Sequence, residues 1–280
     1  MIIFKKSADL SEYLRQQQAS GRTIGFVPTM GALHAGHTSL ISLSKADGAL
    51  TVCSVFINPT QFNDKNDLEK YPVSTDADIE LLLQAGCDVL FLPPVSEVYP
   101  GGEDNAATFD FGYLDTVLEG ANRPGHFRGV GQVMARLLSI VAPQRLYMGQ
   151  KDYQQCMIVR RLLQLTGNTA ELIICPIVRE PYGLAMSSRN RRLTEPQRVL
   201  AAILYQCLVS VQAQQENGSF ARVQKECNDL MKAKGIEPEY VSLARAADLF
   251  LLTDYSPGTP TVALIAARVG SIRLIDNMLL

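Results

Sequence analysis

The chain has 280 residues, of which 47% are apolar and 19% charged, and its formal net charge is −2. This composition is that of a folded globular protein without a disordered or low-complexity tract. The balanced charge argues against a nucleic-acid-binding protein, which normally carries a basic excess, and favours small-molecule partners. No run approaches the ~20 apolar residues that span a bilayer. We therefore expect neither nucleic acid nor a membrane as partner.

The cysteines and the N-terminus indicate the compartment. Six cysteines are spread along the chain without a CxxC pair. This spacing suits neither a zinc site nor a disulfide scaffold, so reduced thiols are expected. The N-terminus soon turns polar and lacks the apolar stretch of a signal peptide. Together these features predict a cytoplasmic protein.

In the first part of the chain, segments with the apolar pattern of a strand alternate with segments that have the pattern of a helix. Strands are predicted at 23–27, 50–57, 88–92 and 145–148, and helices at 36–47, 76–85, 131–141 and 152–165. The run 50–57 is apolar or β-branched apart from small hydroxyls, as in a parallel strand buried on both faces. Such alternation predicts an α/β fold, a doubly wound Rossmann-like parallel sheet, over residues 1–176.

The pattern changes after Pro176. Helical stretches are predicted at 195–215 and 220–234, and strands follow at 240–244, 261–267 and 272–275. Two helices followed by three strands are typical of an α+β arrangement. Residues 177–280 are therefore predicted to form a smaller α+β domain.

The segment PTMGALHAGH (28–37) lies between the first predicted strand and the next helix. In an open parallel sheet, ligands bind at the carboxyl ends of strands. His34 and His37 bracket Gly36 at a helix start, where N–H groups and the helix dipole suit phosphate. Their imidazoles can donate hydrogen bonds to phosphate oxygens as charge builds there. Two histidines three residues apart can also simply cap a helix. However, the whole chain has only three histidines, and two of them fall in this strand-to-helix turn.

A second segment, MSSRN (186–190), carries small hydroxyls and a cation. Hydroxyls and main-chain N–H groups bind phosphate oxygens, and Arg189 can form a bidentate pair with a departing pyrophosphate. Alone, such a loop is more often an ordinary turn. With the early HxGH loop, however, the chain resembles the HIGH nucleotidyltransferase superfamily.

Five segments narrow this resemblance. They are PTMGALHAGH (28–37), VFINPTQF (55–62), RPGHFRGV (123–130), GQKDYQQ (149–155) and REPYGLAMSSRN (179–190). In this order and spacing they resemble the pantothenate synthetase family, the pantoate–beta-alanine ligases, over essentially the whole chain. The resemblance implies an AMP-forming ligase that joins pantoate to beta-alanine through a pantoyl adenylate, with ATP as co-substrate. It also implies a homodimer.

The resemblance also implies site residues. ATP is expected to contact Met30, Gly31, Ala32, Leu33, His34, Ala35, Gly36, His37, Gly149, Gln150, Lys151, Asp152, Val178, Met186, Ser187, Ser188 and Arg189. The catalytic groups among them are His34, His37, Lys151 and Arg189, with His37 as the proton donor. Gln61 and Gln155 are expected to bind pantoate, because an amide can read both a hydroxyl and a carboxylate. No segment has metal-ligand spacing, so Mg²⁺ is expected to arrive with ATP.

Some features leave alternatives open. Family members often carry Ala-Asp where this chain has Pro181-Tyr182, a stiffer and bulkier approach to the late loop. His126 suits either a lid-shaping loop or direct ligand contact. Two other functions compete: an adenylyltransferase that places AMP on a phosphate monoester, and a regulatory module that binds nucleotide without turnover. The two glutamine segments disfavour the first, and the intact histidines and cations disfavour the second.

Overall fold

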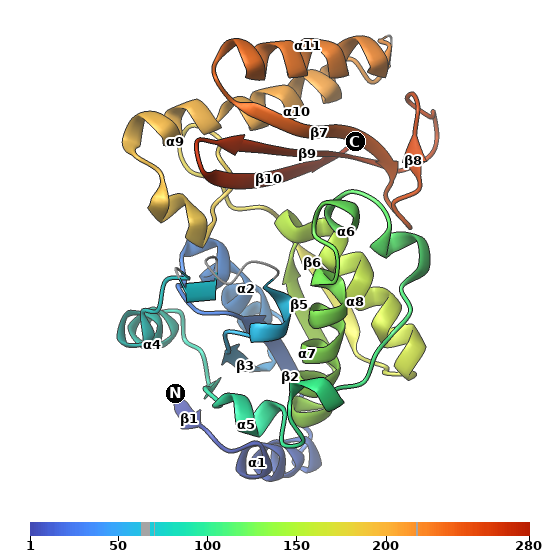
Figure 1. The fold of residues 1–280 in the computed structure, drawn as a ribbon. Helices are drawn as coiled ribbons and strands as arrows, with labels where there is room; N and C mark the ends of the chain where they lie inside the picture. The colour runs from blue at the N-terminus through green and yellow to red at the C-terminus, as the bar shows by residue number, and fades with distance from the viewer. Residues whose placement is uncertain (63–67, 70, 217) are drawn as a thin grey trace. The chain divides into compact units, whose positions relative to one another are not determined.

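The computed structural model describes residues 1–62, 68–69, 71–216 and 218–280. The chain divides into two compact units (Figure 1). The first comprises Met1–Gly149 and Ile158–Cys175, and the second comprises Gln150–Met157 and Pro176–Leu280. The segment Gln150–Met157, predicted to belong to the first domain, therefore groups with the second unit.

A six-stranded parallel sheet forms the centre of the first unit. Its strands are β1 (Ile2–Phe4), β2 (Ile24–Thr29), β3 (Leu50–Val55), β4 (Val89–Phe91), β5 (Arg145–Gly149) and β6 (Glu171–Cys175), in the order β1-β4-β3-β2-β5-β6. The chain leaves β2 through β3 and β4, returns to β5 beside β2, and goes on to β6. The order thus reverses between β2 and β5, and such a switch point is where ligands bind in open α/β sheets.

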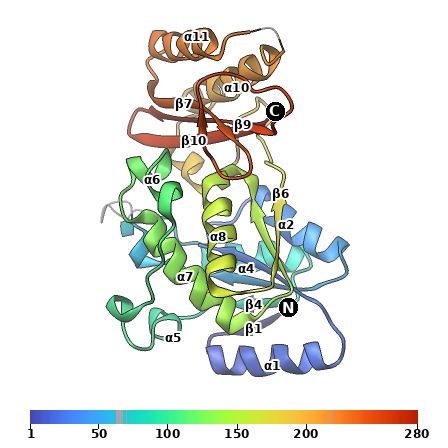
Figure 2. The same cartoon turned by 90° about the vertical axis from the view of Figure 1, so that its right-hand side faces the viewer.

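Helices cover both faces of this sheet. They are α1 (Ser7–Ala19), α2 (Ala35–Ala46), α4 (Thr75–Gln84), α5 (Val95–Val98), α6 (Glu119–Asn122), α7 (His126–Val141) and α8 (Tyr153–Thr166), with short 3₁₀ turns η1 (Pro59–Gln61), η2 (Glu103–Asn105), η3 (Gly112–Asp115) and η4 (Gln150–Asp152). Helix α2 packs with α4 and α1 packs with α7. Figure 2 shows α2 and α7 on opposite sides of the sheet, as right-handed crossovers in both directions require. The predicted doubly wound fold is confirmed.

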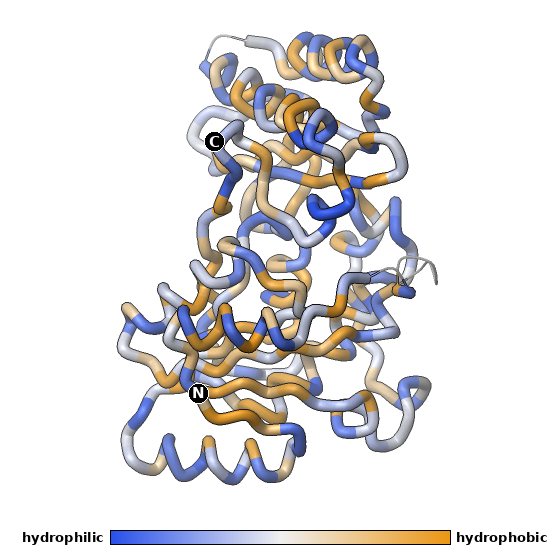
Figure 3. The backbone as a smooth tube through the Cα atoms, turned by 90° about the vertical axis from the view of Figure 1, so that its left-hand side faces the viewer, coloured by the Kyte–Doolittle hydropathy of each residue, from blue (hydrophilic) through white to orange (hydrophobic). Residues whose placement is uncertain are grey.

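The core of the first unit follows the strands. All six residues of β3 are buried, as predicted for a central parallel strand. Figure 3 shows hydrophobic residues along the strands of this unit, whereas α1 alternates between hydrophilic and hydrophobic positions. Only Leu10 and Leu14 of α1 are buried. A helix with such a narrow apolar stripe gives a weak periodic signal, and α1 was not predicted, nor were β1 and β6.

Helix α7 begins five residues earlier than the predicted 131–141. Gly129 and Gly131 lie within it, and glycine lowers helix propensity, so the first turns do not look helical in the sequence. Gly129 has a packing reason to be there. A Cβ on it would lie 2.3 Å from the carbonyl oxygen of Thr60, so α7 rests directly on η1.

The second unit is built on a four-stranded antiparallel sheet of order β10-β9-β7-β8. Its elements are η5 (Ser188–Arg192), α9 (Glu195–Ala201), α10 (Ile203–Ala213), α11 (Phe220–Ala233), β7 (Glu237–Arg245), β8 (Leu251–Leu252), β9 (Thr261–Val269) and β10 (Ile272–Leu279). Helices α10 and α11 pack on the sheet and share one apolar core with β7, β9 and β10. The predicted α+β class is confirmed, although the single helix expected at 195–215 is divided near Ala202.

The cysteines are all free and buried, as predicted. Burial is the main cause that raises the pKa of Cys87 and of Cys175 to about 11. These thiols therefore stay protonated near neutral pH and are poor nucleophiles. Across the described ranges, no helix combines the length and the apolar character needed to cross a membrane.

Candidate nucleotide and substrate site

The predicted site residues lie in both units. The first unit holds Met30–His37, Gln61 and Gly149, and the second holds Gln150, Lys151, Asp152, Gln155, Val178 and Met186–Arg189. Within the first unit, the loop after β2 and the end of β5 both belong to the switch point of the sheet. The sequence prediction therefore places its first set of ligand contacts at the edge where parallel sheets bind ligands.

The loop from Met30 to Leu33 turns through left-handed backbone. Gly31 has φ +81° and Ala32 has φ +49°. A Cβ on Gly31 would lie 2.9 Å from Oδ2 of Asp78 and 3.1 Å from Cγ1 of Val55. Glycine is thus required at position 31 by both conformation and space. Ala32, which has no such freedom, must be held in place by its surroundings.

Asp78 of α4 holds this loop. Its Oδ2 accepts a hydrogen bond from the Ala32 N–H at 2.8 Å, and its Oδ1 accepts one from the Leu33 N–H at 2.8 Å. The Ser74 hydroxyl donates to the same Oδ1 at 3.1 Å. Asp78 is only 2% exposed. Sequence reasoning missed it, because an aspartate in the first turn of a helix is usually explained by the helix dipole.

Replacement of Asp78 by asparagine is expected to lower the free energy of unfolding by about 1–3 kcal/mol. Asparagine offers one carbonyl oxygen, so the Ala32 or the Leu33 N–H would face an NH₂ group and remain unsatisfied. Ser74→Ala is the matched control, since it removes one bond to Asp78 and leaves both main-chain bonds. Urea unfolding of both variants tests this, and an unchanged midpoint for Asp78→Asn would refute it.

His34 and His37 cap helix α2 reciprocally. His34 is the N-cap residue, and its Nδ1 accepts a hydrogen bond from the Gly36 N–H at 3.1 Å. The His34 N–H in turn donates to Nδ1 of His37 at 3.3 Å. The ring centroids are 4.1 Å apart.

This capping fixes the tautomer of both rings. A nitrogen that accepts a hydrogen bond carries no proton, so a neutral ring of His34 or His37 bears its hydrogen on Nε2. Both rings then present an N–H donor on the side away from the capping bonds. The capping reading and the phosphate-donor reading of HxGH are therefore compatible.

Gln61 lies in η1, just after β3, and is 8% exposed. Its Nε2 donates to the sulfur of Met30, which brings these two predicted site residues together. Asn58 Nδ2 donates to Oε1 of Gln61 at 3.3 Å and to the carbonyl of Gly129 at 3.2 Å. The Tyr99 hydroxyl donates to Asn58 Oδ1 at 2.9 Å. The Gln61 amide is thus oriented by a buried network.

His126 supports the main chain of Gln61. The ring is buried, with Nδ1 2.9 Å from the Gln61 carbonyl oxygen and Nε2 3.0 Å from Nη1 of Arg123. A guanidinium can only donate, so Nε2 accepts and the Nδ1–H donates to Gln61. His126 therefore helps to hold the main chain of η1 in place.

In the second unit, Lys151 lies in η4 with a side chain that is 19% exposed. Its Nζ is 3.3 Å from Oδ1 of Asp152. Gln155 lies in the first turn of α8 and is half-buried, whereas its neighbour Gln154 is 2% exposed. The Tyr153 hydroxyl donates to the carbonyl of Ala246 at 2.8 Å and ties the start of α8 to the α+β unit. The Lys151 side chain is therefore largely buried rather than fully solvated.

The segment 178–186 folds back on itself as a short two-stranded turn. The Met186 N–H donates to the Val178 carbonyl at 3.0 Å, and the Gly183 N–H donates to the Glu180 carbonyl at 2.8 Å. Pro181 occupies the second position of that turn, where its fixed φ is favourable. Tyr182 is exposed and its hydroxyl donates to Glu195 Oε1 at 3.2 Å. The Pro181-Tyr182 departure thus fits the turn.

The turn leads into η5. Ser187 is the N-cap of η5, and its Oγ accepts from the Arg189 N–H at 3.2 Å, while Ser188 is buried. Asn190, 4% exposed, donates through Nδ2 to Glu180 Oε1 at 2.8 Å and to the Ala185 carbonyl at 3.0 Å. Asn190 therefore closes the loop that carries the predicted Ser-Ser-Arg contacts, a role without a signal in the sequence.

A dedicated metal cage is not built into the described part of the chain. No group of three or more histidine, cysteine, aspartate or glutamate side chains there could hold a metal ion.

Comparisons with known proteins agree with this arrangement. A family model described as pantoate-beta-alanine ligase matches residues 2–279. A pantothenate synthetase of Cytophaga hutchinsonii is 42% identical over 100% of this chain and 99% of its own length, and one of Phocaeicola vulgatus is 44% identical over 96% of each.

Solved structures agree as well. The pantothenate synthetase of Thermus thermophilus superimposes with a TM-score of 0.91 at 38% identity over 99% of both chains. The Francisella tularensis pantoate-beta-alanine ligase, in complex with beta-gamma ATP and beta-alanine, gives a TM-score of 0.82 at 34% identity over 100% of this chain and 97% of its own.

Proposed function

The chain belongs to the pantoate–beta-alanine ligase family, and we propose that it joins pantoate to β-alanine with ATP, releasing AMP, pyrophosphate and pantothenate. The observation that carries the proposal is the paired capping of α2, in which both Nδ1 atoms of His34 and His37 accept from the main chain. Two Nε2–H donors at the N-terminus of a helix make a site for a phosphate group that gains negative charge.

The reaction has two steps. An oxygen of the pantoate carboxylate attacks the α-phosphorus of ATP, the bond to the bridging oxygen breaks, and pyrophosphate leaves. The β-alanine nitrogen then attacks the acyl carbon of the pantoyl adenylate, the bond to the phosphate oxygen breaks, and AMP leaves. The amine loses its proton in this step. Most of the acceleration comes from positioning and electrostatics, with no protein nucleophile.

We assign the following roles. His34 and His37 donate to oxygens of the α-phosphate, and Lys151 and Arg189 neutralise the departing pyrophosphate. The other ATP contacts are Met30, Gly31, Ala32, Leu33, Ala35, Gly36, Gly149, Gln150, Asp152, Val178, Met186, Ser187 and Ser188. Gln61 and Gln155 bind pantoate. Mg²⁺ enters with ATP and adds positive charge at the phosphates.

Four further assignments complete the proposal, of which the homodimer rests on the family resemblance alone. Residues 1–176 bind nucleotide and pantoate, and residues 177–280 act as a lid. The protein works as a homodimer and in the cytoplasm. Six free, buried thiols suit a reducing compartment.

Product analysis of the purified protein tests the proposed function. With Mg-ATP, pantoate and β-alanine, AMP and pantothenate should form together, and omission of any one substrate should stop both. With Mg-ATP and pantoate but without β-alanine, the enzyme should still exchange labelled pyrophosphate into ATP, because the first step is reversible. Transfer of AMP to a phosphate monoester, or the absence of turnover, would contradict the proposal.

Gly129→Ala is expected to raise the KM for pantoate and to lower stability by about 1–3 kcal/mol through overpacking. The new Cβ would lie 2.3 Å from the Thr60 oxygen and 2.7 Å from the Gln61 nitrogen, so η1 must shift. Gly131→Ala in the same helix is the control, since its Cβ would meet the Phe111 ring at 2.6 Å instead. Both variants should be less stable, but only Gly129→Ala should lose pantoate affinity. Equal pantoate KM values would refute the role of Gln61.

A further inference from the structure

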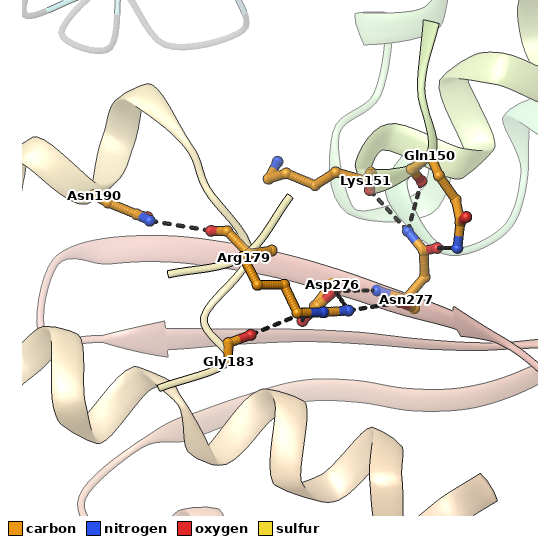
Figure 4. Close-up of polar contacts among 8 residues, drawn as sticks. Gln150, Lys151, Arg179, Gly183, Asn190, Asp276 and Asn277 are labelled. Atoms are coloured by element: carbon orange, nitrogen blue, oxygen red, sulfur yellow. Dashed lines mark hydrogen bonds and ion pairs between the residues drawn. The ribbon is translucent and has the colours of Figure 1, made fainter. Parts of the chain in front are cut away.

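Two neighbouring residues of β10, Asp276 and Asn277, make polar contacts far beyond their own strand (Figure 4). They are 4% and 2% exposed. In register they lie opposite Ile265 and Leu264 of β9, and β10 is an outer strand of the sheet order. Successive strand residues point to opposite faces, so each of the two can serve a different segment of the second unit.

Asp276 holds the stem of the 178–186 turn through Arg179. The guanidinium donates from Nη1 to Oδ2 at 2.5 Å and from Nη2 to Oδ1 at 3.1 Å, which is a bidentate pair. Nη1 also donates to the Gly183 carbonyl at 3.0 Å, and the guanidinium stacks 4.1 Å from the ring of Tyr205. Arg179 thereby fixes both the start and the turn of the segment that leads to Met186–Arg189.

Asn277 holds the other segment, η4. Its Nδ2 donates to the carbonyl oxygen of Gln150 at 2.8 Å and to that of Lys151 at 2.9 Å, and its Oδ1 accepts from Nε2 of Gln150 at 3.1 Å. The two bonds to carbonyl oxygens fix the main chain at Gln150 and Lys151, and the third holds the Gln150 side chain. Figure 4 shows the Lys151 side chain extending away from this anchor.

We propose that Asp276 and Asn277 are positioning residues for ATP: together they hold η4, with Lys151, and the Met186–Arg189 loop at one fixed spacing on β10. The inference rests on the proposed function, in which these two segments bind the phosphates of one ATP. The cations Lys151 and Arg189 must meet the same triphosphate, and small errors of placement weaken catalysis strongly. The geometry makes β10 the common support of both.

Asn277→Ala tests the inference most sharply. We expect about a 10²-fold loss in kcat/KM for ATP in pyrophosphate exchange, the size of effect that misplacement of about 1 Å produces, with the KM for β-alanine unchanged. Gln224→Ala is the matched control. It removes a side-chain bond of 2.7 Å to the Val241 carbonyl on β7 of the same sheet. It should lower stability without altering the kinetics with ATP.

A double-mutant cycle separates positioning from general loss of structure. If Asn277 acts through Lys151, then Asn277→Ala added to Lys151→Met should cost almost nothing more in exchange rate. Full additivity of the two losses, or kinetics with ATP at the parent level for Asn277→Ala, would overturn the inference. Asn277→Ser keeps one donor, so its loss in kcat/KM for ATP should lie between the parent and Asn277→Ala if the inference holds. This variant replaces Asn277→Ala in the test if the alanine variant does not fold.

The proposed function can be wrong independently of the positioning role of Asn277. If the parent protein exchanges no pyrophosphate with pantoate present, the ligase assignment is wrong. ATP binding to the parent, to Asn277→Ala and to Gln224→Ala, measured by calorimetry, then still tests the positioning. Equal dissociation constants for all three would overturn it.

Discussion

His37→Asn should fold like the parent chain and form the adenylate about 10²–10³-fold more slowly, the usual effect of removing one donor from a charge-stabilising site. Asparagine Oδ1 takes the place of imidazole Nδ1, so it can still accept from the His34 N–H and preserve the cap of α2. It has no group at the position of Nε2. The variant therefore removes the proposed phosphate donor without removing the cap.

His37→Gln is the complementary variant. Its amide NH₂ reaches the position of imidazole Nε2, but glutamine has no acceptor at the Nδ1 position. It should lose the cap, at a cost of about 0.5–2 kcal/mol in unfolding free energy, while keeping more activity than His37→Asn. Thermal unfolding and pyrophosphate exchange measure the two effects separately. If the asparagine variant exchanges at the parent rate, His37 acts in the cap alone.

Lys151→Met should lose about 10²–10³-fold in kcat/KM for ATP, because a positive charge beside a departing pyrophosphate is worth several kcal/mol in the transition state. Methionine keeps an unbranched side chain of similar reach and leaves the main-chain bonds to Asn277 untouched. Stability should change little, since the parent ion pair with Asp152, at 3.3 Å, is partly solvated. Steady-state kinetics with ATP as the varied substrate give the ratio.

Lys225→Met controls for the loss of a lysine. Lys225 lies on α11, exposed, with an ion pair to Asp229 at 2.6 Å. Its replacement should leave the kinetics unaltered. Lys151→Arg should fall between parent and methionine variant, because it keeps the charge but replaces a compact ammonium by a planar fork. Parent kinetics for Lys151→Met would remove Lys151 from the site.

The local parts of the site could be predicted from the sequence, and the long-range parts could not. His34 and His37 are recognisable because both lie in one strand-to-helix turn, so spacing and position carry the signal. Asp78, which holds the same loop, is 46 residues from Ala32 along the chain. Nothing in a helix-start aspartate reveals that it will be buried against a loop.

Distance along the chain is also the reason why the contacts of β10 could not be predicted. Arg179 is 97 residues from Asp276, and Gln150 is 127 residues from Asn277. Their pairing depends on how the strand runs past two loops, which no local pattern encodes. The family resemblance supplied the residues proposed to touch ligand, whereas the groups proposed to position them became visible only in the folded chain.

The central claim, that a pantoate oxygen bonds to the α-phosphorus of ATP, is tested most directly with pantoate labelled by ¹⁸O in both carboxylate oxygens. After reaction with unlabelled ATP and β-alanine, mass spectrometry should find one labelled oxygen in AMP and the other in the amide carbonyl of pantothenate. Unlabelled AMP, with the label in pyrophosphate or phosphate instead, would contradict the adenylate route and the roles of His34 and His37 with it.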